Sequence, residues 1–469
     1  MAKKILDYIF YPESVALVGA SNSEGKIGYF YMKNLVDDFR GKIFPVNPNE
    51  ETVQGLKSYK SIKEIPDAVD LAVIVVPTKA VLEVIEDCAH KGVKAALVTT
   101  SGFGEVGKEG KELENRMLEI ARKGRVKIIG PNSFGLRNCN VGLNATFAFE
   151  GAKEGGDISF LTQSGGGGEA IYVQAKDTGL RFAKFIVCGN KSDLEDYEVV
   201  EYFGDDKETK VICLFLEAIK EGKRFFEETK KVALKKPVVV SKIGRTEGAA
   251  RAASSHTAAL AGDFKAYETA FRQSGAIYAR NTLELMDIVK GLDWQPLPKG
   301  NRVGIITASG GFGVELTDLC EEHGLKIPEL SEKTQAKIRP HIPSYASAKN
   351  PVDMTPVWAQ FEKIMEVTIE EFYKSREIDI IVPIIVLRAT RMKEVLESVR
   401  DVILKCQKEI KKPTYICWIS LKDSLRNKEI FEDAKIPCFE WTERVANAAS
   451  AIYGYSKFLQ KRGVDIKNM

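Results

Sequence analysis

The stretch Leu71-Ala72-Val73-Ile74-Val75-Val76-Pro77 is apolar at every position and ends in a proline. A strand with this composition is buried on both faces, as in a parallel sheet that is covered by helices on each side. Similar strand-like runs occupy residues 15–19, 42–48, 95–101 and 126–132, and amphipathic stretches separate them. We therefore predict that the N-terminal part of the chain is a doubly wound parallel sheet of the Rossmann type.

Two later segments open in the same way as each other. Residues 157–162 form a strand-like run that leads into Gln163-Ser164-Gly165-Gly166, and residues 302–307 lead into Ala308-Ser309-Gly310-Gly311. Residues 291–300 separate the two segments. This stretch ends with Pro296, Pro298 and Gly300, which is typical of a linker. The sequence predicts an α/β protein of three doubly wound, Rossmann- or flavodoxin-like parallel-sheet units in tandem. The expected domains are residues 1–145, 146–292 and 300–469.

Both of these openings place the start of a helix directly after a strand. A helix N-terminus offers backbone N–H groups without partners and a partial positive charge, and both suit phosphate. Ligands of a doubly wound sheet bind at the carboxyl ends of its strands. The candidates for phosphate binding are therefore Gln163, Ser164, Gly165, Gly166, Ser309, Gly310 and Gly311.

One of the four histidines, His256, lies in a run of small residues between a strand-like segment, residues 237–243, and a helical segment that starts at Phe264. A histidine nitrogen can carry a phosphoryl group as a covalent intermediate. A loop histidine with one hydrogen bond and no role is the simpler interpretation. The predicted phosphate sites elsewhere in the chain favour a phosphoryl carrier instead.

Glu217 directly follows the apolar run at residues 211–216, so it is expected at the carboxyl end of a strand in the same unit as His256. A carboxylate there could bond one imidazole nitrogen and leave the other nucleophilic. An ordinary exposed glutamate at a strand end explains the spacing equally well. We take His256 and Glu217 as the candidate catalytic residues.

Three glycine-rich loops come close to nucleotide-binding motifs. Residues 19–26 have one residue too many for a Walker A loop, and Ile27 stands where Ser or Thr is required. Residues 102–107 match G-x-G-x-x-G but follow a late strand, and residues 165–170 lack the later acidic residue that would hold a ribose. Tight turns explain each loop singly. A nicotinamide-dependent oxidoreductase nevertheless stays open as an alternative.

Composition excludes several classes of partner. The net charge is only +3, from 68 basic and 65 acidic side chains, and this gives no reason to expect nucleic acid or a membrane. Asp7 comes too early for a secretory signal, and the apolar run at residues 378–387 is too short to span a bilayer. The eight cysteines lack zinc or redox spacing and are expected to be buried free thiols. We predict a cytoplasmic protein without a metal site.

Several motifs together resemble one family. They are Gly244-Arg245-Thr246-Glu247, Ser254-Ser255-His256-Thr257, Leu161-Thr162-Gln163-Ser164-Gly165, Asn350-Pro351-Val352-Asp353 and Gly130-Pro131-Asn132-Ser133-Phe134-Gly135. Over essentially its whole length, the chain resembles the alpha subunits of the ADP-forming acetate–CoA ligases. These are NDP-forming acyl-CoA synthetases and relatives of succinyl-CoA synthetase.

The resemblance implies an acid–thiol ligase that converts acyl-CoA, ADP and phosphate reversibly into a carboxylic acid, CoA and ATP. An acyl phosphate would form first and would then phosphorylate His256, with Glu217 orienting the ring. Phospho-His256 would pass its group to ADP. Acetate, branched-chain acids and aryl acids all stay open as substrates. A non-catalytic CoA-binding regulator is a further alternative, and it would have no need of His256.

The resemblance also implies that CoA binds the first unit, at the carboxyl ends of its strands. Lys26 is the natural partner for a CoA phosphate, because an ammonium group forms charge-assisted hydrogen bonds with phosphate oxygens. The expected CoA contacts are Gly19, Ser21, Asn22, Lys26, Ile27, Gly28, Val46, Asn47, Val76, Pro77, Ser101, Gly102, Phe103, Gly104, Glu105 and Asn132.

The chain has no true Walker A loop, and its three units are accounted for as sheets that open in glycine turns. The resembling family holds ADP or ATP with magnesium on an ATP-grasp fold, either fused to the chain or on a beta subunit. The sequence ends at Met469, soon after the third unit. We therefore expect a separate ATP-grasp beta subunit in an α2β2 assembly.

Overall fold

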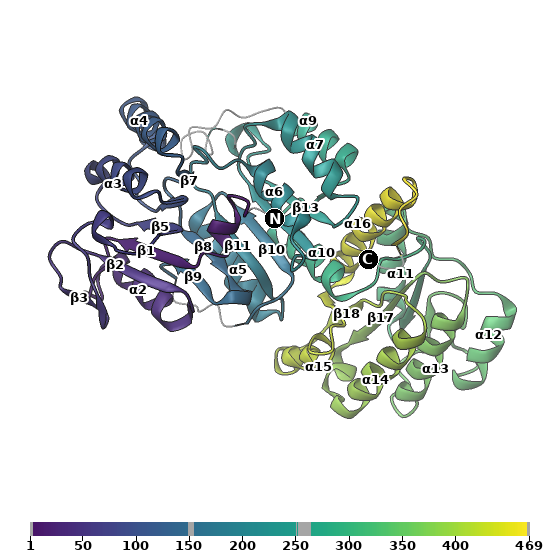
Figure 1. Cartoon of the computed structure of the whole chain (residues 1–469). Coiled ribbons are helices and arrows are strands. Elements are labelled where there is room, and N and C mark those ends of the chain that lie inside the picture. The colour runs from purple at the N-terminus through teal and green to yellow at the C-terminus, as the bar shows by residue number, and fades with distance from the viewer. Residues whose placement is uncertain (1–2, 149–153, 250, 252–263, 467–469) are drawn as a thin grey trace. The chain divides into compact units, whose positions relative to one another are not determined.

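The chain folds into two compact units, Met1–Tyr278 and Ala279–Met469 (Figure 1). His256 lies outside the part of the chain that can be described. The computed structural model describes residues 3–148, 154–249, 251 and 264–466.

The first sheet of the first unit contains, among the described residues, five parallel strands in the order β2-β1-β5-β6-β7. These strands are β1 (Ser14–Val18), β2 (Lys42–Val46), β5 (Leu71–Ile74), β6 (Ala95–Val98) and β7 (Lys127–Ile129). The helices are α1 (Asp7–Phe10), α2 (Ile27–Asp38), α3 (Thr78–Lys91) and α4 (Lys108–Gly124), and a small hairpin consists of β3 (Thr52–Val53) and β4 (Leu56–Lys57).

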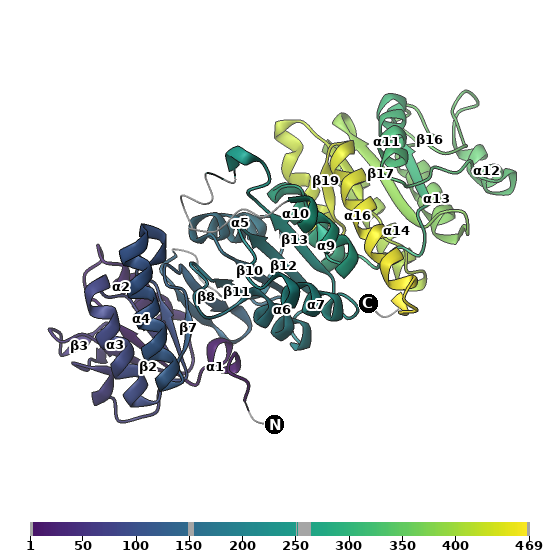
Figure 2. The same ribbon diagram turned by 90° about the horizontal axis from the view of Figure 1, so that it is seen from above.

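Side chains of β5 alternate between the two faces of this sheet. Leu71 and Val73 belong to the hydrophobic cluster that contains α2, whereas Ala72 and Ile74 belong to the cluster that contains α3 and α4. Figure 2 shows α3 and α4 side by side. Helices therefore cover both faces, and this is why the strand is apolar at every position.

The second sheet has seven strands within the described residues, in the order β14-β13-β12-β10-β11-β8-β9. Its parallel strands are β10 (Ile158–Thr162), β11 (Phe182–Val187), β12 (Val211–Leu216), β13 (Val238–Lys242) and β14 (Ile277–Tyr278). Its antiparallel strands are β8 (Gly135–Asn138) and β9 (Leu143–Thr146). Its helices are α5 (Gly165–Asp177), α6 (Asp196–Asp205), α7 (Gly222–Val232) and α9 (Phe264–Ser274).

One hydrophobic cluster joins the two sheets of the first unit. It contains Leu17 of β1 and Met32 of α2 together with Leu161 of β10 and Ile212 of β12. Burial of shared apolar surface is the main favourable term in folding, and close packing transmits position from one element to the next. The loops of the first sheet are therefore held at fixed positions relative to the loops of the second.

The second unit contains a third sheet, parallel throughout its described strands, in the order β16-β15-β17-β18-β19. The strands are β15 (Val303–Thr307), β16 (Val352–Asp353), β17 (Ile380–Val386), β18 (Ile416–Ile419) and β19 (Cys438–Glu440). The helices are α10 (Thr282–Trp294), α11 (Gly310–Glu322), α12 (Glu332–Ile338), α13 (Phe361–Lys374), α14 (Lys393–Glu409), α15 (Glu429–Glu432) and α16 (Thr442–Gln460).

The predicted fold class, tandem α/β units with largely parallel sheets, is confirmed. The division into domains stays a prediction, and two elements bear on it. Residue 145 lies inside β9, which pairs with β8 in the second sheet. Helix α10 belongs to the second compact unit, where Lys290 and Asp287 form ion pairs with Glu432 at 2.8 Å and Arg444 at 2.7 Å.

All eight cysteines are buried free thiols, as expected. In the described part of the chain, every helix is too short or too polar to cross a membrane.

The turn after β1 depends on Gly28 in the first turn of α2. A Cβ atom at Gly28 would lie 2.0 Å from the carbonyl oxygen of Gly19, which itself has a φ of +94°. Gly28→Ala must push the helix away from the strand, so we expect the free energy of unfolding to fall by about 1–3 kcal/mol in denaturant titration.

Gly25→Ala is the matched control for this substitution, because a Cβ at Gly25 would meet nothing within 4 Å. Its expected effect is below about 0.5 kcal/mol. Equal losses for the two variants would contradict the argument from close approach.

Candidate functional site

A pocket of about 330 Å³ lies in the first unit, where loops of the first sheet meet the start of α5. Most of its lining residues follow the carboxyl end of a strand, the place where doubly wound sheets bind ligands. The lining residues are Ile27, Thr99, Asn132, Ser133, Phe134, Phe147, Gln163, Ser164, Gly165, Gly166, Gly189, Asn190 and Glu217. Predicted CoA contacts, predicted phosphate contacts and one predicted catalytic residue are thereby brought together.

The start of α5 forms one wall of this pocket. Thr162 Oγ1 donates to the carbonyl of Ser164 at 3.0 Å, and Ser164 caps the helix without a side-chain bond to its backbone. A Cβ at Gly166 would meet nothing within 4 Å, so this turn is open. The first N–H groups of a helix lack intrahelical acceptors and favour anions. The wall has the chemistry that a phosphate group requires.

Gln163 joins this wall to the segment that carries Glu217. Its Oε1 accepts hydrogen bonds from the backbone N–H groups of Glu217 at 3.3 Å and Ala218 at 3.1 Å. Gln163 and Glu217 are both buried. Breaking a buried hydrogen bond is costly, so these two bonds hold the backbone of Glu217 in a fixed position beside α5.

The surroundings of Glu217 carry positive charge. Lys242, at the end of β13, is buried, and burial together with the charge of Lys191 lowers its pKa, while the charge of Glu217 opposes that shift. Lys191 is also buried and pairs with Asp196 at 2.7 Å. Lys191 Nζ also donates to the carbonyl of Ala218, so a buried lysine lies beside the segment that carries Glu217.

An ion pair fixes α5 against the sheet. Arg137 of β8 is fully buried and bonds both carboxylate oxygens of Glu169, at 2.7 and 2.8 Å. Its guanidinium lies 4.2 Å from the centre of the Tyr172 ring. Burial alone would lower the pKa of Arg137, but the hydrogen bond and charge of Glu169 outweigh burial and raise it. The pair therefore sets the position of the helix whose N-terminus lines the pocket.

The remaining predicted CoA contacts lie along the carboxyl edge of the first sheet. Around α2, Lys26 precedes the helix and is exposed, and Gly28 lies within it. Val46 is the last residue of β2. The others follow strands: Gly19, Ser21 and Asn22 follow β1, Asn47 follows β2, Val76 and Pro77 follow β5, and Ser101, Gly102, Phe103, Gly104 and Glu105 follow β6. Of all the predicted CoA contacts, only Ile27 and Asn132 line the pocket itself. The others are arranged along one edge, as a long ligand would require.

Glu105 has a structural role that the sequence did not reveal. Its carboxylate accepts from the backbone N–H groups of Gly102 at 2.5 Å and Phe103 at 3.2 Å. It also accepts from Nδ2 of Asn190 at 2.5 Å. This side chain shapes the loop that contains it.

Ser309, Gly310 and Gly311 begin α11 in the second unit. Ser309 N–H donates to Thr307 Oγ1 at 2.9 Å, and this hydroxyl donates to the Ser309 carbonyl, also at 2.9 Å. The turn repeats the bond from Thr162 to Ser164 in the first unit. The predicted similarity of the two openings is therefore present in their hydrogen bonds. His256 cannot be placed, because it lies outside the described residues.

Six lining residues are not among the predicted site residues. Thr99, Ser133 and Asn190 follow strands closely, so the strand-end rule that found the others could have found them. Phe147 follows β9, a strand that the sequence did not predict. The six are Thr99, Ser133, Phe134, Phe147, Gly189 and Asn190.

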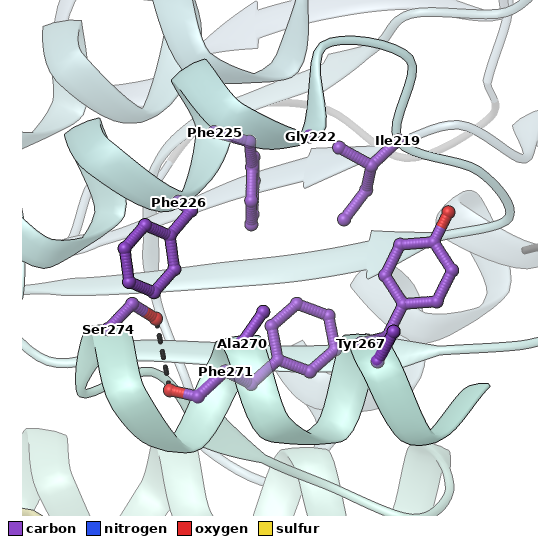
Figure 3. A pocket seen from close by; sticks show the side chains of 9 residues that line it. Ile219, Gly222, Phe225, Phe226, Tyr267, Ala270, Phe271 and Ser274 are labelled. Atoms are coloured by element: carbon purple, nitrogen blue, oxygen red, sulfur yellow. Dashed lines mark hydrogen bonds between the residues drawn. The ribbon is translucent and has the colours of Figure 1, made fainter. Parts of the chain in front are cut away.

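A second pocket, of the same volume, lies between α7 and α9 (Figure 3). Its lining residues carry no charge. They include the aromatic side chains of Phe225, Tyr267 and Phe271. The hydroxyl of Ser274 donates to the carbonyl of Phe271 at 3.0 Å, the bond drawn in Figure 3. Size does not separate the two pockets, but chemistry does, because an anionic ligand needs convergent polar groups. The polar pocket is the candidate site.

Three domain families match the chain. A CoA binding domain matches residues 13–138, a succinyl-CoA ligase like flavodoxin domain matches residues 155–292, and a ligase-CoA domain matches residues 303–448. The alpha subunit of ADP-forming acetate–CoA ligase II from Pyrococcus furiosus is 42% identical over 462 residues, which cover 97% of this chain and 98% of the relative. The chain belongs to the ADP-forming acetate–CoA ligase family.

Other members of the family differ in length. ADP-forming acetate–CoA ligase I of Archaeoglobus fulgidus is 36% identical over 98% of this chain, yet the chain spans only 65% of that relative. A solved structure, the dinucleotide forming acetyl-coenzyme A synthetase 1 of Ca. Korarchaeum cryptofilum with phosphate and ADP, superposes with a TM-score of 0.90. It is 34% identical and covers 97% of this chain and 98% of its own.

Membership of this family confirms the resemblance drawn from the motifs, and the family is one of acid–thiol ligases. These relatives favour neither the oxidoreductase nor the non-catalytic regulator. The roles of the individual site residues stay predictions.

The ion pair beneath α5 can be tested by Glu169→Gln. The substitution keeps the shape but leaves the buried guanidinium of Arg137 without a counter-charge, so we expect the free energy of unfolding to fall by about 3 kcal/mol. Glu119→Gln removes an exposed partner of Lys123 on α4 and should cost less than about 0.5 kcal/mol. Denaturant titration measures the free energy of unfolding of both variants. A negligible effect of Glu169→Gln would show that the ion pair does not hold α5 in place.

Proposed function

We propose that this chain is the alpha subunit of an ADP-forming acyl-CoA ligase, which converts acyl-CoA, phosphate and ADP reversibly into carboxylic acid, CoA and ATP. One observation carries the proposal. Residues expected to contact CoA, residues expected to hold phosphate and Glu217 line a single pocket. Acetate is the substrate named for the relatives, and other carboxylic acids stay open for this chain.

The first step forms an acyl phosphate. CoA lies along the carboxyl edge of the first sheet, with its thioester at the pocket, and phosphate lies at the N-terminus of α5 beside Ser164 and Gly166. A phosphate oxygen attacks the acyl carbon, the carbon–sulfur bond breaks, and the thiolate leaves as CoA. Fixed N–H dipoles stabilise the charge that develops, and they need no reorganisation during the reaction.

The second step moves the phosphoryl group to His256. A ring nitrogen attacks phosphorus, the bond to the acyl oxygen breaks, and the carboxylate leaves. Glu217 accepts a hydrogen bond from the other ring nitrogen and stabilises the positive charge that the ring acquires. The start of α11, at Ser309, Gly310 and Gly311, offers N–H groups of the same kind and is a second candidate phosphate site, in the second unit. Positioning and fixed charges supply most of such catalysis.

The last step needs ADP and magnesium, which we assign to an ATP-grasp beta subunit in an α2β2 assembly. Two comparisons support a partner. The relative from Pyrococcus furiosus is named as an alpha subunit, and the relative from Archaeoglobus fulgidus carries further sequence within one chain. The related structure with phosphate and ADP supports these two ligands as substrates.

Phosphorylation of His256 is the direct test. After incubation with acetyl-CoA and phosphate, we expect the intact protein to gain one phosphoryl group that is labile in acid and stable in base, as a phosphoramidate is. His256→Ala should gain none. His90→Ala, which replaces an exposed histidine of α3, should be labelled like the wild type. A stable phosphate on any residue other than His256 would refute the mechanism.

The partner is tested by the chain alone. Supplied with acetyl-CoA, ADP and phosphate, the purified chain should release CoA in an amount close to that of the enzyme and form no ATP beyond background, because nothing accepts the phosphoryl group. A coupled luciferase assay measures the ATP. Continuous ATP formation by the chain without a second protein would rule out the assignment of the nucleotide site to a partner.

A further inference from the structure

Asn190 lies at the junction of four segments of the first unit. It lies three residues after the end of β11 and lines the candidate pocket. Three parts of the residue form hydrogen bonds to other segments: its side-chain N–H₂, its backbone N–H and its backbone carbonyl. The residue therefore offers more than a side chain on the pocket wall.

The side-chain amide bonds two carboxylates from the first sheet. Nδ2 donates to Glu105 at 2.5 Å and to Glu114 of α4 at 3.1 Å. Glu105 and Glu114 in turn accept from backbone N–H groups of the loop after β6, at Gly102, Phe103 and Gly104. Burial would raise the pKa of Glu114, but bonds from Lys111 and Asn190 lower it, so this carboxylate is ionised. The amide is thus the shared donor to two carboxyl groups that shape a loop expected to contact CoA.

The backbone of Asn190 bonds the other two segments. Its N–H donates to the carbonyl of Pro131 at 3.0 Å, next to the predicted CoA contact Asn132. Its carbonyl accepts from Nζ of Lys220 at 2.9 Å. Lys220 lies three residues after Glu217. One residue therefore ties two of the predicted CoA loops, those after β6 and β7, to the segment that carries the predicted catalytic carboxylate.

We propose that Asn190 is a positioning residue that holds the CoA loops and the Glu217 segment in the alignment required for acyl phosphate formation. The inference rests on the proposed function. Asn190 acts through Glu105, Glu114, Pro131 and Lys220. Reacting atoms must be placed to within about 1 Å for efficient attack, so a loosened junction slows the chemical step more than it weakens binding.

Asn190→Asp is the sharpest test. The new carboxylate is isosteric, cannot donate, and faces the carboxylates of Glu105 and Glu114. We expect the single-turnover rate constant for CoA release from acetyl-CoA and phosphate to fall about 10- to 100-fold, because charge-assisted bonds are lost. The Kd of CoA, measured by calorimetry, should change less than about threefold, since the turn after β1 is untouched. A purely structural role would change the melting temperature without slowing CoA release more than it weakens CoA binding.

A reciprocal exchange provides the rescue. In Glu105→Gln, the amide oxygen can still accept from Gly102, while its N–H₂ can donate to an aspartate at position 190. Asn190→Asp combined with Glu105→Gln should therefore be several times faster than Asn190→Asp alone. Asn301→Asp is the matched control, since it makes the same chemical change at a side chain bonded to the Gly324 carbonyl in the second unit. Its single-turnover rate constant should equal that of the wild type.

Failure of the inference about Asn190 and failure of the proposed function give different experimental results. A single-turnover rate constant for Asn190→Asp within about twofold of the wild type overturns the inference, as does a double variant no faster than the single one. If Asn190→Asp fails to fold by circular dichroism, Asn190→Ser carries the test, with an expected loss of about tenfold. A wild-type chain that releases no CoA in the presence of phosphate would refute the proposed function itself, a different result from an unaffected variant.

Discussion

Parallel pairing of β10 with β11 and β12 is the constraint on which the pocket depends. Thr162 lies opposite Val187 on one neighbouring strand and opposite Phe215 on the other. The three strands therefore end at one level, and the residues that follow them emerge at one edge. This is how Gln163, Asn190 and Glu217 come to line one pocket although they are far apart in the sequence. A register slip of one residue would turn every side chain of the shifted strand to the other face.

Two side-chain contacts fix the polar wall of the pocket. Gln163 holds the backbone at Glu217, and Arg137 holds Glu169 in the first turns of α5. A buried polar group without a partner costs free energy, and these hydrogen bonds supply the partners. They also fix the walls of the pocket. Groups fixed in advance stabilise developing charge without reorganising, so the network links packing to the proposed phosphoryl chemistry.

Local pattern and long-range pairing differ in what they reveal, and β5 and β8 illustrate the difference. The apolar run at residues 71–77 is sufficient to predict a strand buried on both faces, because its own composition carries the signal. Strand β8 contains Arg137 and Asn138, and side chains of these types are usually exposed to solvent. They are buried because Glu169 accepts from one and the carbonyl of Phe10 from the other. No pattern within four residues contains those distant partners.

The sequence by itself determined the α/β class, the turns that end each strand and the family, because these depend on residue types at short and regular spacing. It also indicated Gln163, Ser164, Gly165, Gly166 and Glu217 through the rule that ligands bind at strand ends. Only the tertiary structure decided that Ile27 and Asn132 share a pocket with them, and that Glu105 shapes a loop through Asn190. The physical reason is that these relations depend on how two sheets pack on one hydrophobic core, and no segment of the chain specifies that packing alone.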